Sequence, residues 1–147
     1  MKFKNLAAIV CGIVLMCSSL CSAANLNAAN VSVGGIYPGM SVNELTNAFG
    51  QPNRRGDDEW NYPTFEVEIE GGIVEKVSTR SETMVTPNGV RVGMSADALN
   101  SSYGAADRVD RDYNEVEYEY YSTDGMKKIE FKVVNGVIVK ITCKLRD

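Results

Sequence analysis

The chain has 147 residues and a formal net charge of −4 at pH 7. It contains no histidine, which excludes Ser-His-Asp and Cys-His catalysis and most zinc sites. The acidic balance repels nucleic acid and anionic membranes at long range, so we expect neither as a partner.

Residues 1–24 have the three parts of a secretory signal peptide. Lys2 and Lys4 form a basic start, Leu6–Met16 is an apolar run, and small residues up to Ala24 suit cleavage. The apolar run has about 11 residues, well short of the ~20 that a membrane-spanning helix needs, so we expect no stable membrane anchor. Removing this segment leaves 13 basic against 19 acidic residues, a net charge of −6. We therefore predict an exported protein, periplasmic or extracellular.

The cysteines favour neither a lipid anchor nor a disulfide. Three of the four precede residue 25, and both Cys17 and Cys21 follow a large residue where a lipidated cysteine normally follows a small one. Cys143 is then the single cysteine of the mature chain, so no intrachain disulfide is expected. Apolar residues alternate along the strand that contains Cys143. This pattern places Cys143 on one face with Val137, Val139 and Ile141 and predicts that it lies in the core.

After a segment expected to be a flexible lead-in (25–35), one phrase occurs twice. It reads GMSVNELTNAFG at 39–50 and GMSADALNSSYG at 93–104. In the first copy Ser41 and Glu44 form a capping box, and Gly50 supplies a helix stop, which predicts a helix over 42–49. In the second copy we expect Ser95 to cap an equivalent helix without the capping box.

Three strands are expected after each helix. Gly71-Gly72 joins the last two strands of the first half, and the hairpin signals Asp124-Gly125 and Asn135-Gly136 join the strands of the second half. The predicted strands are 59–63, 64–70, 73–80, 115–121, 127–134 and 137–144. We predict an α+β fold of two tandem α-β-β-β units, 36–84 and 85–147. They form one domain, with an antiparallel sheet and short helices packed on one face. Glu75 falls on the apolar face, so that strand end is exposed or its register differs.

The period-2 pattern makes the other sheet face charged and solvent-facing. Tyr118 and Tyr120 are expected in the core and Tyr121 on the charged face, whereas Trp60 and Tyr62 suit either the core edge or a contact surface. Rows of glutamate and lysine also fit an ordinary solvated surface. The candidate protein-contact residues are Trp60, Tyr62, Glu66, Glu68, Glu117, Glu119, Tyr121, Lys128 and Lys132.

The repeated pattern resembles the superfamily of the β-lactamase inhibitory protein and of the small lipoprotein of the outer-membrane β-barrel assembly machine. The matching residues are Gly39, Met40, Ser41, Leu45, Phe49, Gly50, Pro52, Trp60 and Tyr62 in the first copy, and Gly93, Met94, Ser95, Leu99, Tyr103 and Gly104 in the second. The tandem arrangement is closer to the inhibitory protein. The resemblance implies a binding role without catalytic residues, through a concave sheet face that grips a protein. The chain departs from this pattern at Ala105-Ala106, lacks a second tryptophan, and cannot form the disulfides of the inhibitors.

No catalytic, cofactor-binding or metal site is predicted. The stretch 110–115 starts like a calcium loop, but Glu115 stands where that loop needs glycine. The leading hypothesis is an exported, non-catalytic protein-binding module, inhibitor-like or an envelope-assembly accessory. It would bind a protein partner through the charged sheet face and the loops 51–58 and 105–114. The alternative is a small-ligand carrier or sensor with a pocket between the two repeats.

Overall fold

The computed structural model describes residues 25–147, so the predicted signal peptide lies outside the described residues. The elements in chain order are η1 (Ala28–Asn30), α1 (Val42–Phe49), β1 (Arg54–Arg55), β2 (Glu59–Asn61), β3 (Glu66–Glu70), β4 (Ile73–Thr79), α2 (Asp97–Tyr103), β5 (Arg108–Arg111), β6 (Glu115–Tyr121), β7 (Lys127–Val134) and β8 (Val137–Leu145). The predicted helix 42–49 and all six predicted strands are present. In the described part of the chain, no helix is long and apolar enough to cross a membrane.

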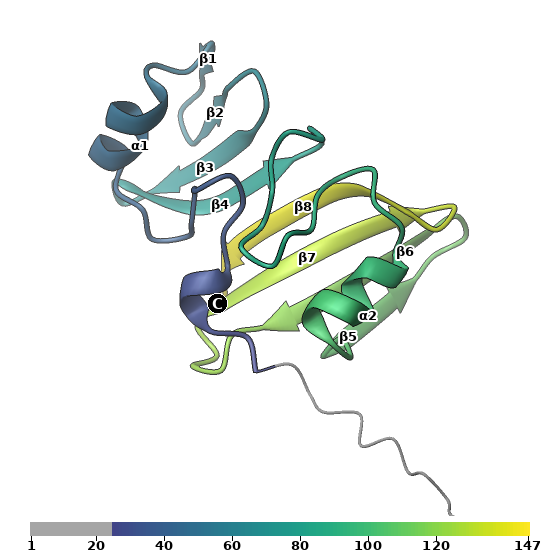
Figure 1. The fold of residues 1–147 in the computed structure, drawn as a ribbon. Helices are drawn as coiled ribbons and strands as arrows, with labels where there is room; N and C mark the ends of the chain where they lie inside the picture. Colours follow the sequence, from purple (N-terminus) through teal and green to yellow (C-terminus); the bar gives the residue numbers. More distant parts are fainter. Residues whose placement is uncertain (1–24) are drawn as a thin grey trace, which may run out of the picture.

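The eight strands form one antiparallel sheet in the order β1-β2-β3-β4-β8-β7-β6-β5. The N-terminal half (36–84) supplies four neighbouring strands and the C-terminal half (85–147) the other four, as Figure 1 shows. The halves meet where β4 pairs with β8, from Lys76 opposite Lys144 to Thr79 opposite Ile141. The predicted α+β class and antiparallel sheet are therefore confirmed.

Two short edge strands, β1 and β5, were not predicted. Both lie in segments expected to be loops, and β5 reads Arg-Val-Asp-Arg, which is exposed along its whole length and lacks an apolar face. Such short, charged edge strands limit pairing with other chains. Each half therefore contributes four strands rather than three.

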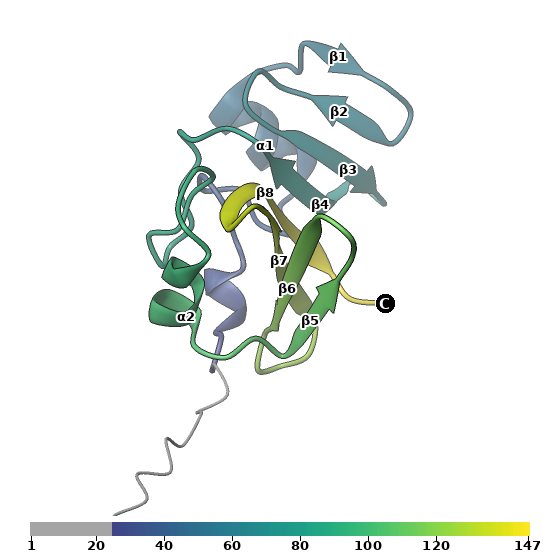
Figure 2. The same cartoon turned by 90° about the vertical axis from the view of Figure 1, so that its right-hand side faces the viewer.

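One face of the sheet is covered by α1, α2, η1 and the segment that follows η1. Leu45 of α1 and Leu99 of α2 belong to one buried apolar cluster, and Figure 2 shows η1 and α2 on the same side of β6 and β7. Burying this face removes apolar surface from water, the main favourable contribution to folding. As expected, Cys143 lies fully buried in this core.

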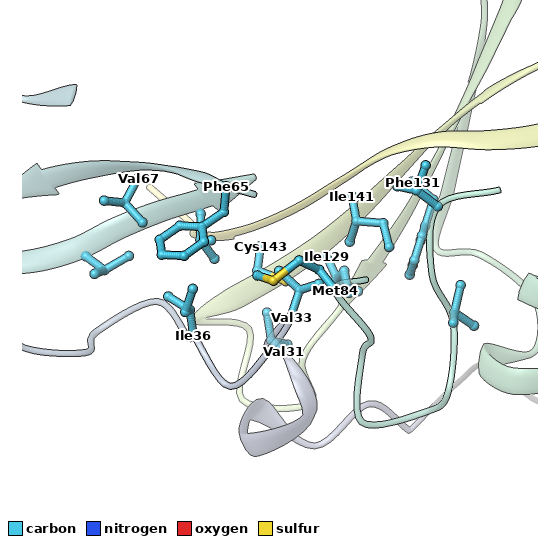
Figure 3. Packing of buried hydrophobic residues seen from close by; sticks show 14 of the residues in the cluster. Val31, Val33, Ile36, Phe65, Val67, Met84, Ile129, Phe131, Ile141 and Cys143 are labelled. Carbon is cyan, nitrogen blue, oxygen red and sulfur yellow. The ribbon is translucent and has the colours of Figure 1, made fainter. Parts of the chain in front are cut away.

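The segment 25–35 differs from the expected flexible lead-in. Val31 and Val33 are fully buried, and Figure 3 shows them packed below the sheet near Ile129 and Cys143. Leu26 is also buried and bridges Ser122. These apolar side chains are spaced too irregularly to predict a regular element, yet they cover the apolar sheet face where the two halves meet.

The helix starts differ between the two copies of the repeated phrase. At α1 the predicted capping box is present, with Ser41 Oγ accepting from Glu44 N at 3.2 Å and a Glu44 carboxylate oxygen accepting from Ser41 N at 3.1 Å. At α2 the cap position is Ala96 instead of the predicted Ser95, and Ala96 has no side-chain cap bond. Ser95 Oγ instead accepts from Asp97 N at 3.3 Å. Ala96 already has helical dihedral angles although α2 is assigned from Asp97, and α2 begins without a reciprocal cap.

Each Gly-Met-Ser segment pairs with the turn and first residues of the last strand in its own half. Three backbone hydrogen bonds recur in each half. They are Gly39 N to Val74 O (2.7 Å), Val74 N to Met40 O (2.8 Å) and Val42 N to Gly72 O (3.1 Å), and Gly93 N to Ile138 O (2.8 Å), Ile138 N to Met94 O (2.9 Å) and Ala96 N to Gly136 O (2.9 Å). Each phrase thus fixes its helix to its own sheet half.

A β-bulge in β4 and another in β8 correct two predicted side-chain orientations. Glu75 in β4 and Val139 in β8 are the extra residues, with no Cα partner on the neighbouring strand. The bulge reverses the alternation, so Ile138 is buried and Val137 is 40% exposed. The prediction that Val137 and Val139 face the core was wrong. The register differs at Glu75, which was one of the two alternatives.

Candidate protein-binding face

The uncovered side of the sheet carries charged residues at alternate positions of the five central strands. We call this surface the charged face. It consists of Glu66 and Glu68 (β3), Lys76 and Ser78 (β4), Lys140, Thr142 and Lys144 (β8), Lys128, Glu130 and Lys132 (β7), and Glu115, Glu117, Glu119 and Tyr121 (β6). Cross-strand pairing aligns these residues in rows, so their spacing is set by the sheet.

One row brings three lysines together, because Lys76 pairs with Lys144 and Lys144 with Lys128. Like charges placed opposite each other on a sheet are destabilising. The adjacent row supplies Glu119 and Glu130, whose carboxylates pair with Lys128 and Lys144. These acidic residues offset the repulsion between the lysines.

The centre of the charged face is an ion-pair network. Lys128 Nζ lies 2.6 Å from a Glu130 carboxylate oxygen and 3.3 Å from one of Glu119, and Lys144 Nζ lies 3.1 Å from Glu130. These side chains are well shielded, since Glu119 is 6%, Glu130 13% and Lys128 17% exposed. Fixed, partly desolvated charges interact more strongly than freely solvated ones.

Burial and ion pairing oppose each other in the pKa values of this network. Burial alone would lower the pKa of Lys128, but its contacts with Glu130 and Glu119 raise it overall. Burial alone would raise the pKa of Glu119, but the hydrogen bond from Tyr121 and the charge of Lys128 lower it overall. Burial raises the pKa of Glu117, and the nearby charges of Glu130 and Glu119 add to the rise. Glu117 is thus the acid of this group whose ionisation the fold disfavours.

Ion pairs also join the outer strands to the centre. Lys76 pairs with Glu68, Lys140 Nζ lies 3.4 Å from Glu66, and Lys132 Nζ lies 2.8 Å from Glu115. Exposed ion pairs typically contribute about 0–1 kcal/mol each. Their main effect is to hold long side chains in defined positions.

Tyr121 marks one end of the charged face. Its hydroxyl donates to a Glu119 carboxylate oxygen at 2.7 Å, and the Arg146 guanidinium lies 4.1 Å from its ring centroid. Both residues line a hollow of about 400 Å³ that Lys76 and Arg108 also border. Tyrosine and arginine are enriched among residues that dominate protein–protein binding energy.

The structure separates the predicted contact residues into two groups. Glu66, Glu68, Glu117, Glu119, Tyr121, Lys128 and Lys132 all lie on the charged face. Trp60 and Tyr62 are 3% and 8% exposed and belong to the core. Arg55 covers the Trp60 ring at 4.3 Å, and the Tyr62 hydroxyl donates to the Gly50 carbonyl at 3.0 Å.

Sequence reasoning missed other residues of this surface. Lys76, Lys140 and Lys144 complete the charged face on β4 and β8, and the alternation of those strands before and after each bulge would have identified them. Arg146 follows β8, and no sequence pattern at that position indicated that it would lie on this surface. In the predicted contact loop 105–114, Tyr113 is 94% exposed between β5 and β6.

Carboxylate oxygens of Glu117, Glu119 and Glu130 lie within 4.8 Å of one another, close enough to ligate one cation. Lys128 already contacts two of these carboxylates and Lys144 contacts one. Lysine ammonium groups therefore supply the positive charge that these acids need.

Comparisons with known proteins identify a shared fold. No protein-family model matches the chain, and no curated protein sequence matches it. A solved structure of a DUF4309 family protein (YjgB) from Bacillus subtilis is similar with a TM-score of 0.52 and 17% identity, covering 72% of this chain and 78% of that protein. An extracellular protein containing a SCP domain from Bacillus anthracis is similar with a TM-score of 0.51 and 10% identity, covering 98% of this chain but only 49% of that protein. The chain thus spans about half the length of the second protein. At these identities the likeness shows the fold alone.

Proposed function

We propose that the chain consists of two tandem α-β-β-β units within one domain, each extended by a short edge strand. The matching hydrogen bonds of the two Gly-Met-Ser segments, the symmetric strand order and the bulges at Glu75 and Val139 support this proposal. Tyr62 also donates to the carbonyl of Gly50 after α1, and Tyr120 donates to that of Gly104 after α2, at 3.0 and 3.2 Å. The similarity to the inhibitory-protein superfamily remains part of this proposal.

We propose further that the protein is an exported, non-catalytic binding module, inhibitor-like or an envelope-assembly accessory, and that the charged face contacts a protein partner. The observation that carries this proposal is the shielded network around Lys128, on the one sheet face that no other described element covers. Charges already fixed in position lose little freedom on binding, so less of the interaction energy is spent on ordering them.

The pattern of charge favours a specific partner over a general electrostatic attraction. A lysine row lies next to a glutamate row on the charged face, and complementary charges on a partner fix its register and exclude mismatched surfaces. Tyr121 with Arg146 supplies an aromatic and guanidinium anchor at one end. We expect a partner surface that presents both signs of charge, with an acidic or carbonyl group near Arg146.

Site-specific photocrosslinking tests this function. A benzophenone amino acid replaces Tyr121 in one variant and the exposed Asn43 of α1 in a control variant. The variants are exposed to culture medium and envelope extract of the source organism. We expect one crosslinked protein from the Tyr121 position and none from the Asn43 position. Equal capture from both positions, or none from either, would refute binding through the charged face.

A charge-reversal pair sharpens the test. Lys132→Glu changes the charged face, whereas Arg91→Glu makes the same change in charge at an exposed residue outside it. We expect Lys132→Glu to weaken capture at the Tyr121 position at least tenfold and Arg91→Glu to leave it unchanged. The same loss in both variants would indicate a general charge effect.

The second candidate function is a small-ligand carrier or sensor. A hollow of about 360 Å³ favours it, because residues 61–66 and 78–81 line it together with Lys140 of the other half. Its volume lies in the usual range for small-molecule sites, roughly 300–1,000 Å³. A screen of thermal stability against a broad set of metabolites should give at least one stabilising compound, and a flat response would count against ligand carriage.

A further inference from the structure

The 360 Å³ hollow at the junction of the two halves is lined by residues whose charge and polarity indicate the class of ligand that it would bind. It lies where β4 ends, between the connection that joins β2 to β3 and the bulged strand β8. The N-terminal half provides most of the lining and the C-terminal half provides Lys140. The pairing of β4 with β8 therefore brings Lys140 into a hollow that the N-terminal half otherwise lines.

Two cations line this hollow against one acid. Among the described residues, no acidic side chain lies within ion-pairing distance of the Arg80 guanidinium. Lys140 has one ion pair, the 3.4 Å contact with Glu66. Glu66 is held by Ser78 Oγ, which donates to it at 2.7 Å, and this hydrogen bond together with the charge of Lys140 keeps its pKa below the usual value. The hollow thus carries a net positive charge in an acidic protein.

A smaller hollow lies next to this region. It has a volume of about 170 Å³, shares Arg80 and Lys140, and adds Lys76, Lys132 and Lys144, with Glu117 and Glu130 as the acids. Ion pairs with Glu68, Glu115 and Glu130 offset the charge of these three lysines, so Arg80 and Lys140 provide the attraction for an anion. Guanidinium is the side-chain group best suited to bind a carboxylate, because its planar fork donates two parallel hydrogen bonds.

The other wall of the hollow is apolar. Tyr62 and Phe65 stack with ring centroids 4.4 Å apart and nearly parallel planes, and Pro63 and Thr64 lie between them in the chain. These rings are mostly buried, so only part of the stack borders the hollow. The same hollow thus has an apolar wall and a guanidinium group in its lining.

We propose that this hollow binds a small aromatic or short-chain organic carboxylate, with Arg80 as the main anion-binding residue and Lys140 as the second. This proposal deepens the carrier or sensor function and rests on it; it is independent of protein binding at Tyr121. The carboxylate has two sources, a free small molecule or the C-terminus of a peptide, and the test includes both.

The experiment follows the amide chemical shifts of residues 25–147 by NMR during titration with benzoate. Benzamide, which has the same ring but no charge, is the control ligand. We expect benzoate to shift the amides of Thr64, Glu66, Ser78 and Arg80, and benzamide to bind at least tenfold more weakly. A dipeptide ending in a free phenylalanine carboxylate and its C-terminal amide form the peptide arm. If the free dipeptide binds more tightly than benzoate, the source is a peptide; if benzoate binds more tightly, the source is a small molecule.

Three variants separate this site from general charge. Arg80→Gln should weaken benzoate binding at least tenfold, whereas Arg111→Gln on the exposed edge strand β5 should leave it unchanged. Glu66→Gln removes the competing carboxylate and should tighten binding severalfold. Arg80 and Arg111 are both exposed, so the Arg80→Gln and Arg111→Gln variants should retain the wild-type unfolding midpoint.

Several outcomes would overturn the proposal. They are equal binding of benzoate and benzamide, unchanged binding by Arg80→Gln, and shifts confined to residues outside the hollow. Tight binding of a neutral metabolite in the thermal screen, with no response to benzoate, would retain the carrier function and reject the carboxylate. Benzoate binding without crosslinking from Tyr121 would retain this site and reject the protein-binding function.

Discussion

Removing one oxygen from each of two neighbouring tyrosines should change stability in opposite directions. Tyr103 of α2 and Tyr120 of β6 are both buried, with ring centroids 5.1 Å apart. Tyr120 donates to the Gly104 carbonyl at 3.2 Å. In the described part of the chain, the Tyr103 hydroxyl is the buried side-chain polar group without a hydrogen bond. Burial raises the pKa of Tyr103, and the nearby Thr86 hydroxyl offsets only part of that rise.

The expected magnitudes follow from these contacts. A buried polar group without a partner costs roughly 1–3 kcal/mol, and an ordinary hydrogen bond contributes about 1 kcal/mol. We therefore expect Tyr103→Phe to raise the free energy of unfolding by up to ~1 kcal/mol. Tyr120→Phe should lower it by ~1 kcal/mol, because it leaves the Gly104 carbonyl without its donor.

Urea unfolding of residues 25–147, followed by circular dichroism, measures both changes. The slope of the transition should be the same for both variants and the wild type, so that midpoints report stability alone. The reasoning would be refuted if Tyr103→Phe were destabilised as much as Tyr120→Phe. That result would mean that the Tyr103 hydroxyl has a hydrogen-bond partner, either the neighbouring Thr86 hydroxyl or a buried water.

Two further pairs of variants test the core and the charged face. Leu45→Ala and Leu99→Ala should each lower the free energy of unfolding by about 2–5 kcal/mol, because both leucines are buried under their helices; a small effect at either position in urea unfolding would contradict equivalent roles for the two helices. For the acids, the pKa of Glu119 is lowered, so its ionised form stabilises the fold at neutral pH and this contribution is lost as the pH falls through its folded value. The pKa of Glu117 is raised, so ionisation weakens the fold as the pH rises. Glu119→Gln should therefore lower Tm at pH 7, Glu117→Gln should raise it, and both differences should shrink at acidic pH; shifts of the same sign at pH 7 would contradict this assignment.

The charged face combines two effects that are usually separate. Its outer ion pairs are exposed and contribute little to stability. Its centre, around Lys128 and Glu130, is shielded by neighbouring long side chains and holds its charges in place. Under the proposed binding function, this arrangement would favour a specific partner, because a mismatched one would leave partly buried charges without compensation.

Local chemistry in the sequence determined most of the secondary structure. Ser41 and Glu44 define the start of α1 because a helix needs acceptors for its first amide groups. Asn135-Gly136 defines the hairpin between β7 and β8 because both residues adopt positive φ angles, at 50° and 76°. Period-2 alternation then assigned Tyr121 and Lys128 to the charged face. Each of these features depends on residues a few positions apart.

Tertiary structure decided the features that depend on contacts between residues far apart in the chain. The bulges at Glu75 and Val139 reverse the faces of their strands; a glutamate on the apolar face was a local sign of the first bulge, whereas no local signal marks the second. Trp60 is buried because Arg55 and the core cover it, and Val31 is buried because the junction of the halves leaves apolar surface that it can cover. The pairing of β4 with β8 sets Lys140 beside Glu66, 74 positions away in the chain. The sequence therefore determined the two helices, the six longer strands and which sheet face is charged. Only the assembled sheet determined the edge strands and which charges meet, because the free energy of burial and of ion pairing depends on neighbours in space.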